Sequence, residues 1–181
     1  MRSVKPIIIC GASATGKSTV ASVIFRKLEL DGVRQSAGDL FRSIADKEGL
    51  TLAELRSLAN EDPSIDIAID RRLLAPARSG DTSVVDGRVL AWLAHQDKLD
   101  AHKVLLTVSW TVAARRLAKR EQLDVDSARF QIDWRSTEDA DRLGKLYGWN
   151  QSDESYYDQV IDTETASPEV IADLIISAAS L

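Results

Sequence analysis

Short apolar runs alternate along the chain with stretches whose apolar residues recur at helical spacing. After the first run, for example, Val20, Val23 and Ile24 share one face of a helix. Strands that alternate with helices form a parallel sheet covered on both faces. The pattern therefore predicts a three-layer α/β/α fold with a five-stranded parallel sheet in the middle. The predicted strands are residues 7–9, 33–37, 82–85, 103–109 and 157–161.

Capping residues divide the helical stretches. Thr51-x-x-Glu54 is a capping box that predicts the start of a short helix. Pro168 stands at the first position of the last predicted helix, a position that proline favours. Residues 124–147 are charged, contain few aliphatic side chains, and are predicted to form one or two exposed helices. No linker separates these elements, so residues 1–181 are predicted to form a single domain.

The first apolar run leads into Gly-x-x-x-x-Gly-Lys-Ser at residues 11–18, directly before a helical pattern. Such a loop holds a polyphosphate with its backbone N–H groups, a lysine charge and the N-terminus of the following helix. A chance match in a glycine-rich loop is the alternative, but the flanking strand and helix favour the functional reading. The sequence therefore predicts a P-loop NTPase fold that binds a nucleoside triphosphate. The residues expected to hold ATP are Gly11, Ala12, Ser13, Ala14, Thr15, Gly16, Lys17, Ser18 and Thr19.

Composition narrows the class of protein. Hydrophobic residues make up 44% of the chain and charged residues 28%, as in an ordinary globular domain. The net charge of −5 argues against a nucleic acid polymer or an anionic membrane as the partner. The single cysteine, Cys10, excludes a disulfide within the chain and is expected to pack as a small apolar residue. No apolar stretch is long enough to span a membrane, so we expect a cytoplasmic protein. A monomer is expected, with a dimer left open.

Polar residues follow the predicted strands at the edge where parallel-sheet proteins bind ligands. Asp86 ends the third strand, where a carboxylate could hold Mg²⁺ together with Ser18; a plain turn aspartate is the alternative. Arg42 and Arg88 follow two different strands and could clamp a second phosphate, although solvated surface arginines are equally compatible with their positions. Asp39 follows the second strand and belongs to the same expected acceptor site.

Later arginines leave two interpretations open. Arg116 and Arg120 lie one helical turn apart after the fourth strand and could contact a base or a transferring phosphate. An ordinary basic helix surface, paired with Glu121, is the alternative that spacing favours. The charged segment is either a mobile lid, over residues 122–148, or a solvated helix face.

Two phrases of the sequence are more specific than the phosphate-binding loop. They are Ser-Ala-Gly-Asp-Leu-Phe-Arg at residues 36–42 and Asp-Gly-Arg at residues 86–88. With them, the chain resembles the nucleoside monophosphate kinases over nearly its whole length, and most closely the short, archaeal-like cytidylate kinases. The resemblance implies ATP with Mg²⁺ as the donor, CMP or dCMP as the acceptor, and a helical insertion at residues 37–80 that binds the acceptor.

The resemblance also implies roles for particular residues. Ser36, Arg42 and Arg88 look like residues that hold the acceptor, the two arginines on its phosphate. Asp86 looks like the acidic residue near Mg²⁺. A second group looks like the catalytic and base-recognising residues of the lid and its entry. This group consists of Arg116, Arg120, Arg135, Asp139 and Arg142.

The chain also departs from the family pattern. Acidic residues, among them Asp133 and Glu138, stand where the family's lid has more arginines, and Val89 replaces an aspartate of the common bacterial pattern. Two other functions therefore stay open beside the cytidylate kinase hypothesis. One is a P-loop kinase of another small acceptor, such as a nucleoside or a specialised metabolite. The other is a nucleotide-responsive binding module with little turnover.

Overall fold

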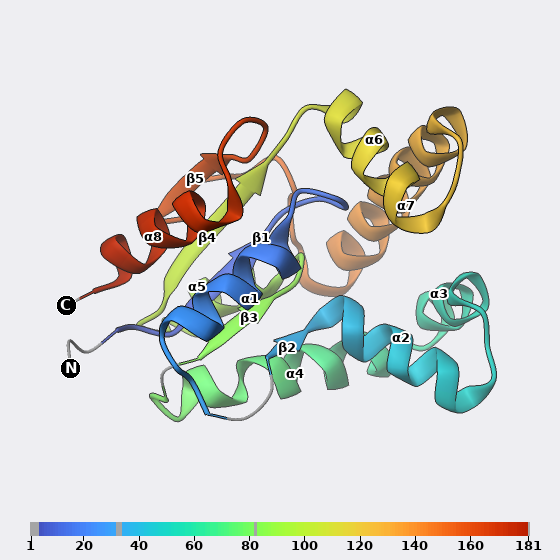
Figure 1. Ribbon diagram of the computed structural model, residues 1–181. Coiled ribbons are helices and arrows are strands. Elements are labelled where there is room, and N and C mark those ends of the chain that lie inside the picture. Colours follow the sequence, from blue (N-terminus) through green and yellow to red (C-terminus); the bar gives the residue numbers. More distant parts are fainter. Residues whose placement is uncertain (1–3, 32–33, 82, 181) are drawn as a thin grey trace.

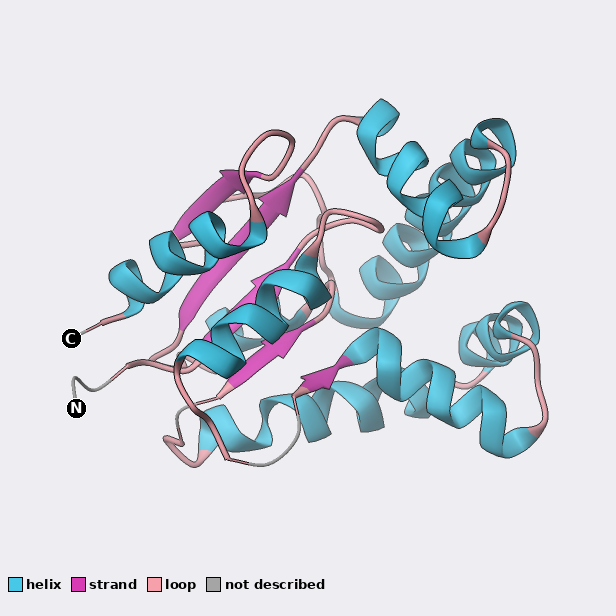
Figure 2. Ribbon diagram, in the orientation of Figure 1, coloured by secondary structure: helices cyan, strands magenta, loops and turns pink. Residues whose placement is uncertain are grey.

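A five-stranded parallel sheet forms the centre of the molecule. The computed structural model describes residues 4–31, 34–81 and 83–180. The strands lie side by side in the order β2-β3-β1-β4-β5 (Figures 1 and 2). All four pairings are parallel, which confirms the predicted sheet. The strands are β1 (Ile7–Cys10), β2 (Gln35–Ser36), β3 (Val84–Asp86), β4 (His102–Thr107) and β5 (Gln159–Asp162).

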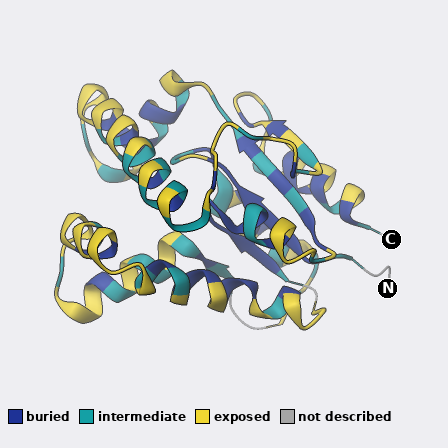
Figure 3. Cartoon of the chain, turned by 180° about the vertical axis from the view of Figure 1, so that it is seen from behind, coloured by how far each residue is buried: buried dark blue, intermediate teal, exposed yellow. Residues whose placement is uncertain are grey.

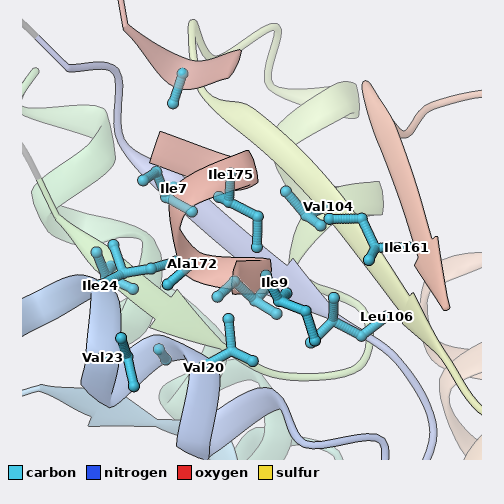
Figure 4. Packing of buried hydrophobic residues seen from close by; sticks show 14 residues of the cluster. Ile7, Ile9, Val20, Val23, Ile24, Val104, Leu106, Ile161, Ala172 and Ile175 are labelled. Carbon is cyan, nitrogen blue, oxygen red and sulfur yellow. The ribbon is translucent and has the colours of Figure 1, made fainter. Parts of the chain in front are cut away.

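Successive residues of β1 point to opposite faces of the sheet and so belong to two different cores. Ile7 and Ile9 pack with α1 (Lys17–Lys27) and α8 (Pro168–Ala179), whose Ile24 and Ile175 are fully buried (Figure 4). Ile8 on the other side joins the core formed with α4 (Ser64–Arg78) and α5 (Leu90–Gln96). The sheet is therefore the middle of three layers, as predicted.

Two helical arms extend beyond the carboxyl edge of the sheet. One contains α2 (Ala37–Glu48), α3 (Leu52–Glu61) and the start of α4. The other contains α6 (Trp110–Glu121) and α7 (Val125–Tyr147), and Figure 1 shows it facing the first arm. The arms are exposed on their outer sides, whereas the strands are mostly buried (Figure 3). Their position leaves the strand ends, the P-loop and the inner faces of both arms around a common space.

Local boundaries differ from the sequence prediction for identifiable reasons. The second strand ends at Ser36 because this residue caps α2, with its hydroxyl accepting from the Asp39 amide. Positions 33 and 82 of the predicted strands lie outside the described residues. The Thr51–Glu54 capping box is present in full at the start of α3. Residues 125–147 form one continuous helix that ends at Gly148, which has a φ of 69°.

The thiol of Cys10 is fully buried at the end of β1. Burial raises its pKa to about 12, so the thiol stays neutral and packs as an apolar group, as expected. Its sulfur accepts a hydrogen bond from the Ala91 amide at 3.4 Å. In the part of the chain that the structure describes, no helix has both the length and the apolar character needed to cross a membrane.

One buried carboxyl joins the two arms behind the space between them. Asp70 in α4 accepts a hydrogen bond of 2.8 Å from the Tyr147 hydroxyl at the end of α7. Burial raises the pKa of Asp70 to about 7, because the hydrogen bond only partly offsets the loss of hydration. The ordinary aspartate pKa is 3.8, so the folded protein holds this proton across a pH range in which the unfolded chain releases it.

We expect Asp70→Asn to change the pH dependence of stability. The raised pKa of Asp70 contributes to the free energy of unfolding. This contribution is fully present below about pH 4 and is lost as the pH rises through 7. The Asn variant cannot ionise and should gain stability relative to wild type over that window, by up to about 1.4 kcal/mol per pH unit. Urea unfolding between pH 4 and 8 measures the difference, and parallel curves for the two proteins would contradict the expectation.

Candidate active site

The loop between β1 and α1 is shaped around two glycines. Gly11 has a φ of +146°, and a Cβ there would lie 2.3 Å from the Leu106 carbonyl oxygen. Gly16 has a φ of +92°, in the left-handed region that glycine tolerates best. The turn places the first amides of α1, which have no partner within the helix, at the ligand edge of the sheet. The loop thus has the backbone geometry that polyphosphate binding requires.

Lys17 lies at the centre of this loop. Its ammonium donates to the carbonyl oxygens of Gly11 at 2.8 Å and Ala12 at 2.6 Å. Burial lowers its pKa to about 8, with the positive charge of Arg88 adding to the effect and Asp86 opposing it. The side chain is therefore still mostly charged at neutral pH, and it stands where phosphate oxygens would approach the loop.

Ser18 and Asp86 come together although they are far apart in sequence. The Ser18 hydroxyl donates to Oδ2 of Asp86 at 2.9 Å, and Asp86 is 2% exposed. Burial raises the pKa of this carboxyl, while Lys17 and Arg34 oppose the rise. A hydroxyl and a carboxylate are the oxygen ligands that suit Mg²⁺, which usually keeps several waters and takes further ligands from phosphates. Among the described residues, no group of three or more His, Cys, Asp or Glu side chains is arranged to hold a metal ion.

A cleft of about 200 Å³ opens between the P-loop and the inner faces of the two arms. Seven basic side chains line it, against four carboxylates, although the whole chain is acidic. The basic residues are Lys17, Arg42, Arg56, Arg88, Arg120, Arg135 and Arg142, and the acidic ones are Asp66, Asp86, Glu121 and Asp139. This excess of positive charge suits a second phosphate-bearing ligand opposite the P-loop.

Asp139 organises three of these guanidinium groups. Its Oδ1 accepts from Arg56 at 2.9 Å and from Arg142 at 3.0 Å, and its Oδ2 pairs with Arg88 at 2.8 Å. Its side chain is 4% exposed, so the charges meet largely out of contact with water. The three arginines come from three different elements, and the carboxylate holds their planar groups in fixed directions toward the cleft.

Of the remaining predicted acceptor residues, Ser36 and Arg42 line the cleft, whereas Asp39 does not. Ser36 is buried under α2, and Arg42 pairs with Asp39 at 2.6 Å. The Arg42 side chain is 52% exposed and free to turn toward a ligand. Arg34, which sequence reasoning missed, pairs with Asp39 at 2.6 Å and with Asp86 at 2.5 Å. The parallel pairing of β2 with β3 brings Arg34 near Asp86, and no local motif indicates that contact.

In the segment predicted as a lid, Arg135 and Arg142 line the cleft, whereas Arg129 is 54% exposed and does not line it. Arg135 pairs with Glu121 at 3.2 Å and its side chain is 16% exposed. Arg120 pairs with the same carboxylate at 2.8 Å, as the surface interpretation expected, yet it also lines the cleft. Arg56 and Glu121 were not predicted as site residues, because the place of each in the site depends on an ion pair with a residue of α7.

Arg116 is not among the residues that line this cleft. It donates to Oγ1 of Thr163 at 2.9 Å and to its carbonyl oxygen at 2.6 Å. Together they line a second hollow on the other side of the P-loop, which Arg120 and Pro168 also border. Lys17 and Ser18 line both hollows. The P-loop therefore borders both hollows.

A P-loop at the carboxyl edge of a parallel sheet, within a three-layer α/β/α fold, is typical of the P-loop kinases. A family model described as "AAA domain" matches residues 7–143. A cytidylate kinase from Halobacterium salinarum is 35% identical over 172 residues, covering 95% of this chain and 88% of the relative. A cytidylate kinase from Sulfurisphaera tokodaii is 36% identical, covering 93% of this chain and 92% of the relative. The chain belongs to the cytidylate kinase family.

Solved structures support the fold independently. Shikimate kinase from Bacteroides thetaiotaomicron superimposes with a TM-score of 0.60 over 97% of this chain and 96% of that one, at 15% identity. An uncharacterised protein from Eubacterium ventriosum gives a TM-score of 0.68 at 16% identity, covering 96% of this chain and 97% of that one. At this level of identity the likeness concerns the arrangement of the elements alone.

Proposed function

We propose that this protein transfers the γ-phosphoryl group of ATP to CMP or dCMP and releases ADP and the diphosphate. The observation that carries the proposal is the pair of hollows that share Lys17 and Ser18, one of them rich in arginine. A donor polyphosphate on the P-loop would face an acceptor phosphate held by Arg42 and Arg88. The family membership supports the same acceptor class, because the relatives that match almost the whole chain are named cytidylate kinases.

The chemistry requires positioning and charge neutralisation more than covalent catalysis. An oxygen of the acceptor phosphate is itself the nucleophile, so no side chain has to attack. In this proposal Lys17 contacts the β- and γ-phosphates of ATP. Arg88 and Arg142 hold the acceptor in position. The arginines on α7, with Arg120, supply positive charge where negative charge spreads in the transition state. Ser18 and Asp86 would hold Mg²⁺, which would supply positive charge that offsets part of the negative charge of the phosphates.

Asp139 serves the acceptor site through the arginines that it holds. Its two oxygens are already engaged by Arg56, Arg88 and Arg142, which keeps these groups oriented before a ligand arrives. Preorganised charges of this kind lower the barrier because they need not rearrange during the reaction. The other functions left open by the sequence, a different small acceptor and a low-turnover binding module, have no comparable support among the relatives.

An ADP-release assay tests the proposal directly. The purified protein is given ATP–Mg²⁺ with CMP, dCMP, UMP, AMP, cytidine or shikimate in turn. We expect rapid ADP release with CMP or dCMP and little with the nucleoside or shikimate. Slow release with every acceptor would favour the binding module instead, and a preference for cytidine would contradict the monophosphate site.

Arg42→Ala should affect the acceptor rather than ATP. Loss of a charged contact to the acceptor phosphate should raise its KM by roughly tenfold or more and lower kcat. The KM for ATP should stay close to that of wild type, because Arg42 does not border the second hollow. Steady-state kinetics with each substrate varied in turn measures this. Arg78→Ala, which removes an exposed arginine paired with Asp97, is the control, and an effect confined to ATP would overturn the assignment.

The oligomeric state and the cellular location stay predictions. We expect a monomer in the cytoplasm, and sedimentation of the purified protein would test the first of these.

A further inference from the structure

A third hollow, of about 420 Å³, adjoins the P-loop and is larger than the acceptor cleft. Its walls come from the P-loop, the end of β4, α6, α7 and the segment of residues 149–157 that leads to β5 (Figure 1). Among the described residues, it shares Ser13 and Arg88 with the acceptor cleft and Thr15 with the hollow beside Arg116. Its other lining residues belong to neither, so it offers room for a ligand outside the donor and acceptor sites.

Buried apolar side chains form part of the walls of the third hollow. Leu106 and Ile132 are each 1% exposed, and Trp149 is 9% exposed. The indole N–H of Trp149 donates to the Tyr156 hydroxyl at 2.8 Å, which fixes this ring within the fold. Sites for small molecules are typically cavities of about 300–1,000 Å³ with apolar walls and a few polar groups. The third hollow therefore has the size and the walls to hold a molecule as large as a nucleoside.

Trp110 lines the same hollow but differs from these buried residues. It is the first residue of α6 and is 53% exposed. In the part of the chain that the structure describes, its indole pairs with no other aromatic ring. An exposed tryptophan beside an apolar hollow offers a flat surface on which a planar base can stack. This residue therefore favours a ligand that contains an aromatic ring system.

The polar groups of the third hollow suit an uncharged ligand rather than a phosphate. They include Ser136 and Gln151, whose side chains form a hydrogen bond of 3.4 Å between α7 and the segment before β5. Glu154 adds a carboxylate that, among the described residues, has no ion-pair partner within 4 Å. The one basic residue that lines the hollow is Arg88, which already pairs with Asp139 at 2.8 Å. The seven basic residues of the acceptor cleft have no counterpart here, so a phosphate would meet little compensating charge.

We propose that the third hollow is a binding site for a nucleoside, separate from the donor and acceptor sites. The base stacks on Trp110 and occupies the apolar part, and the sugar hydroxyls pair with Ser136, Gln151 and Glu154. A sugar hydroxyl can both donate and accept, so it can pair with a carboxylate as well as with an amide or another hydroxyl. A phosphate on the sugar would bring a second negative charge to Glu154, so the site prefers the nucleoside to its monophosphate.

Calorimetry tests this site while the acceptor cleft and the second hollow are filled. Cytidine and adenosine are titrated into protein that already holds saturating CMP and a non-hydrolysable ATP analogue. We expect at least one nucleoside to bind, with the affinity that it has for the protein alone. Binding that is lost when the substrates are present would place the nucleoside in a substrate site and overturn the proposal. The absence of binding by either nucleoside would overturn it as well.

Trp110→Ala should lower the affinity for the nucleoside by about tenfold or more, because it removes the surface on which the base stacks. Trp134→Ala is the matched control. It removes another tryptophan of the same arm, which is 38% exposed and is not among the residues that line the third hollow. Its affinity for the nucleoside should equal that of wild type, and equal affinities in the two variants would overturn the proposal.

Ser136→Phe provides a second variant in case Trp110→Ala does not fold, which circular dichroism would show. Ser136 is only partly buried, and a phenylalanine there should fill the hollow from α7 and abolish nucleoside binding. Wild-type affinity in this variant would overturn the proposal. Trp110→Ala should turn over CMP as wild type does, because Trp110 lines neither the acceptor cleft nor the second hollow. If wild type binds a nucleoside through Trp110 but releases no ADP with CMP, the proposed function is wrong and this site stands.

Discussion

Lys17→Ala should reduce kcat by about 10³-fold or more while leaving the fold intact. Lys17 is the one basic residue of the P-loop, and it lines both hollows. Its ammonium can therefore stabilise negative charge on the phosphoryl group as that group moves from the donor to the acceptor. A cationic group with this effect on rate supplies about 4 kcal/mol of transition-state stabilisation. Its contacts in the structure are hydrogen bonds to two loop carbonyls, which stabilise the core little.

Single-turnover and steady-state assays with ATP and CMP measure the loss. Lys27→Ala is the matched control: it removes a lysine at the far end of the same helix, where it pairs with Asp173 near the surface, and turnover should not change. Normal turnover in Lys17→Ala would remove the lysine from the mechanism.

The pH dependence of wild-type activity tests the role of Lys17 in a second way. Because burial lowers the pKa of Lys17 to about 8, the free protein loses this charge as the pH rises through that value. The kcat/KM for ATP, which reports on free enzyme, should therefore decline above pH 8. The kcat should be less sensitive, since bound phosphates favour the charged lysine. A kcat/KM for ATP that stays flat up to pH 10 would contradict this.

Asp139→Asn should cause the largest loss of stability among single polar substitutions in the cleft. Among the described residues, it leaves Asp66 as the one carboxylate still paired with the three mostly buried guanidinium groups of Arg56, Arg88 and Arg142. Removing one partner from a buried ion cluster typically costs about 3–5 kcal/mol, because the remaining charges lie uncompensated and out of water. The acceptor KM should rise as well, since the arginines lose their common anchor.

Urea unfolding measures the stability, with Asp97→Asn as the control. Asp97 pairs with Arg78 at 2.6 Å in an exposed setting, so its loss should cost no more than about 1 kcal/mol. A loss in Asp139→Asn as small as that of the control would show that the cluster is not held by this carboxylate.

The sequence was informative wherever one short segment carries both structure and chemistry. Gly11 and Gly16 allow the positive φ angles that the turn requires, and Lys17 supplies a cation at the start of the following helix. The three residues therefore occur together in one short segment. The alternation of strands and helices predicted the parallel sheet, and its carboxyl edge indicated where the site would lie. The resemblance to the kinase family added the acceptor arginines and the pairing of Asp86 with the metal site, roles that spacing left undecided.

The remaining site residues depend on contacts between distant segments. Arg34 contacts Asp86 because β2 pairs with β3, and Arg56 reaches Asp139 across the space between the arms. Arg116 and Arg120 look alike in the sequence, yet one anchors to Thr163 and the other lines both hollows. Which arginine of a basic helix faces a site depends on the direction of the helix in space, and its own residues do not determine that direction.

The chain by itself thus determined the parallel sheet, the P-loop and the lysine, because hydrophobic periodicity and turn geometry are local properties. Only the tertiary structure decided how an acidic protein concentrates seven basic groups in one cleft, and which carboxylates hold them there. The physical reason is that buried charges are stable only beside partners. The carboxylates among those partners lie on β3, α4, α6 and α7, and packing of the two arms on the sheet brings them together with the basic groups.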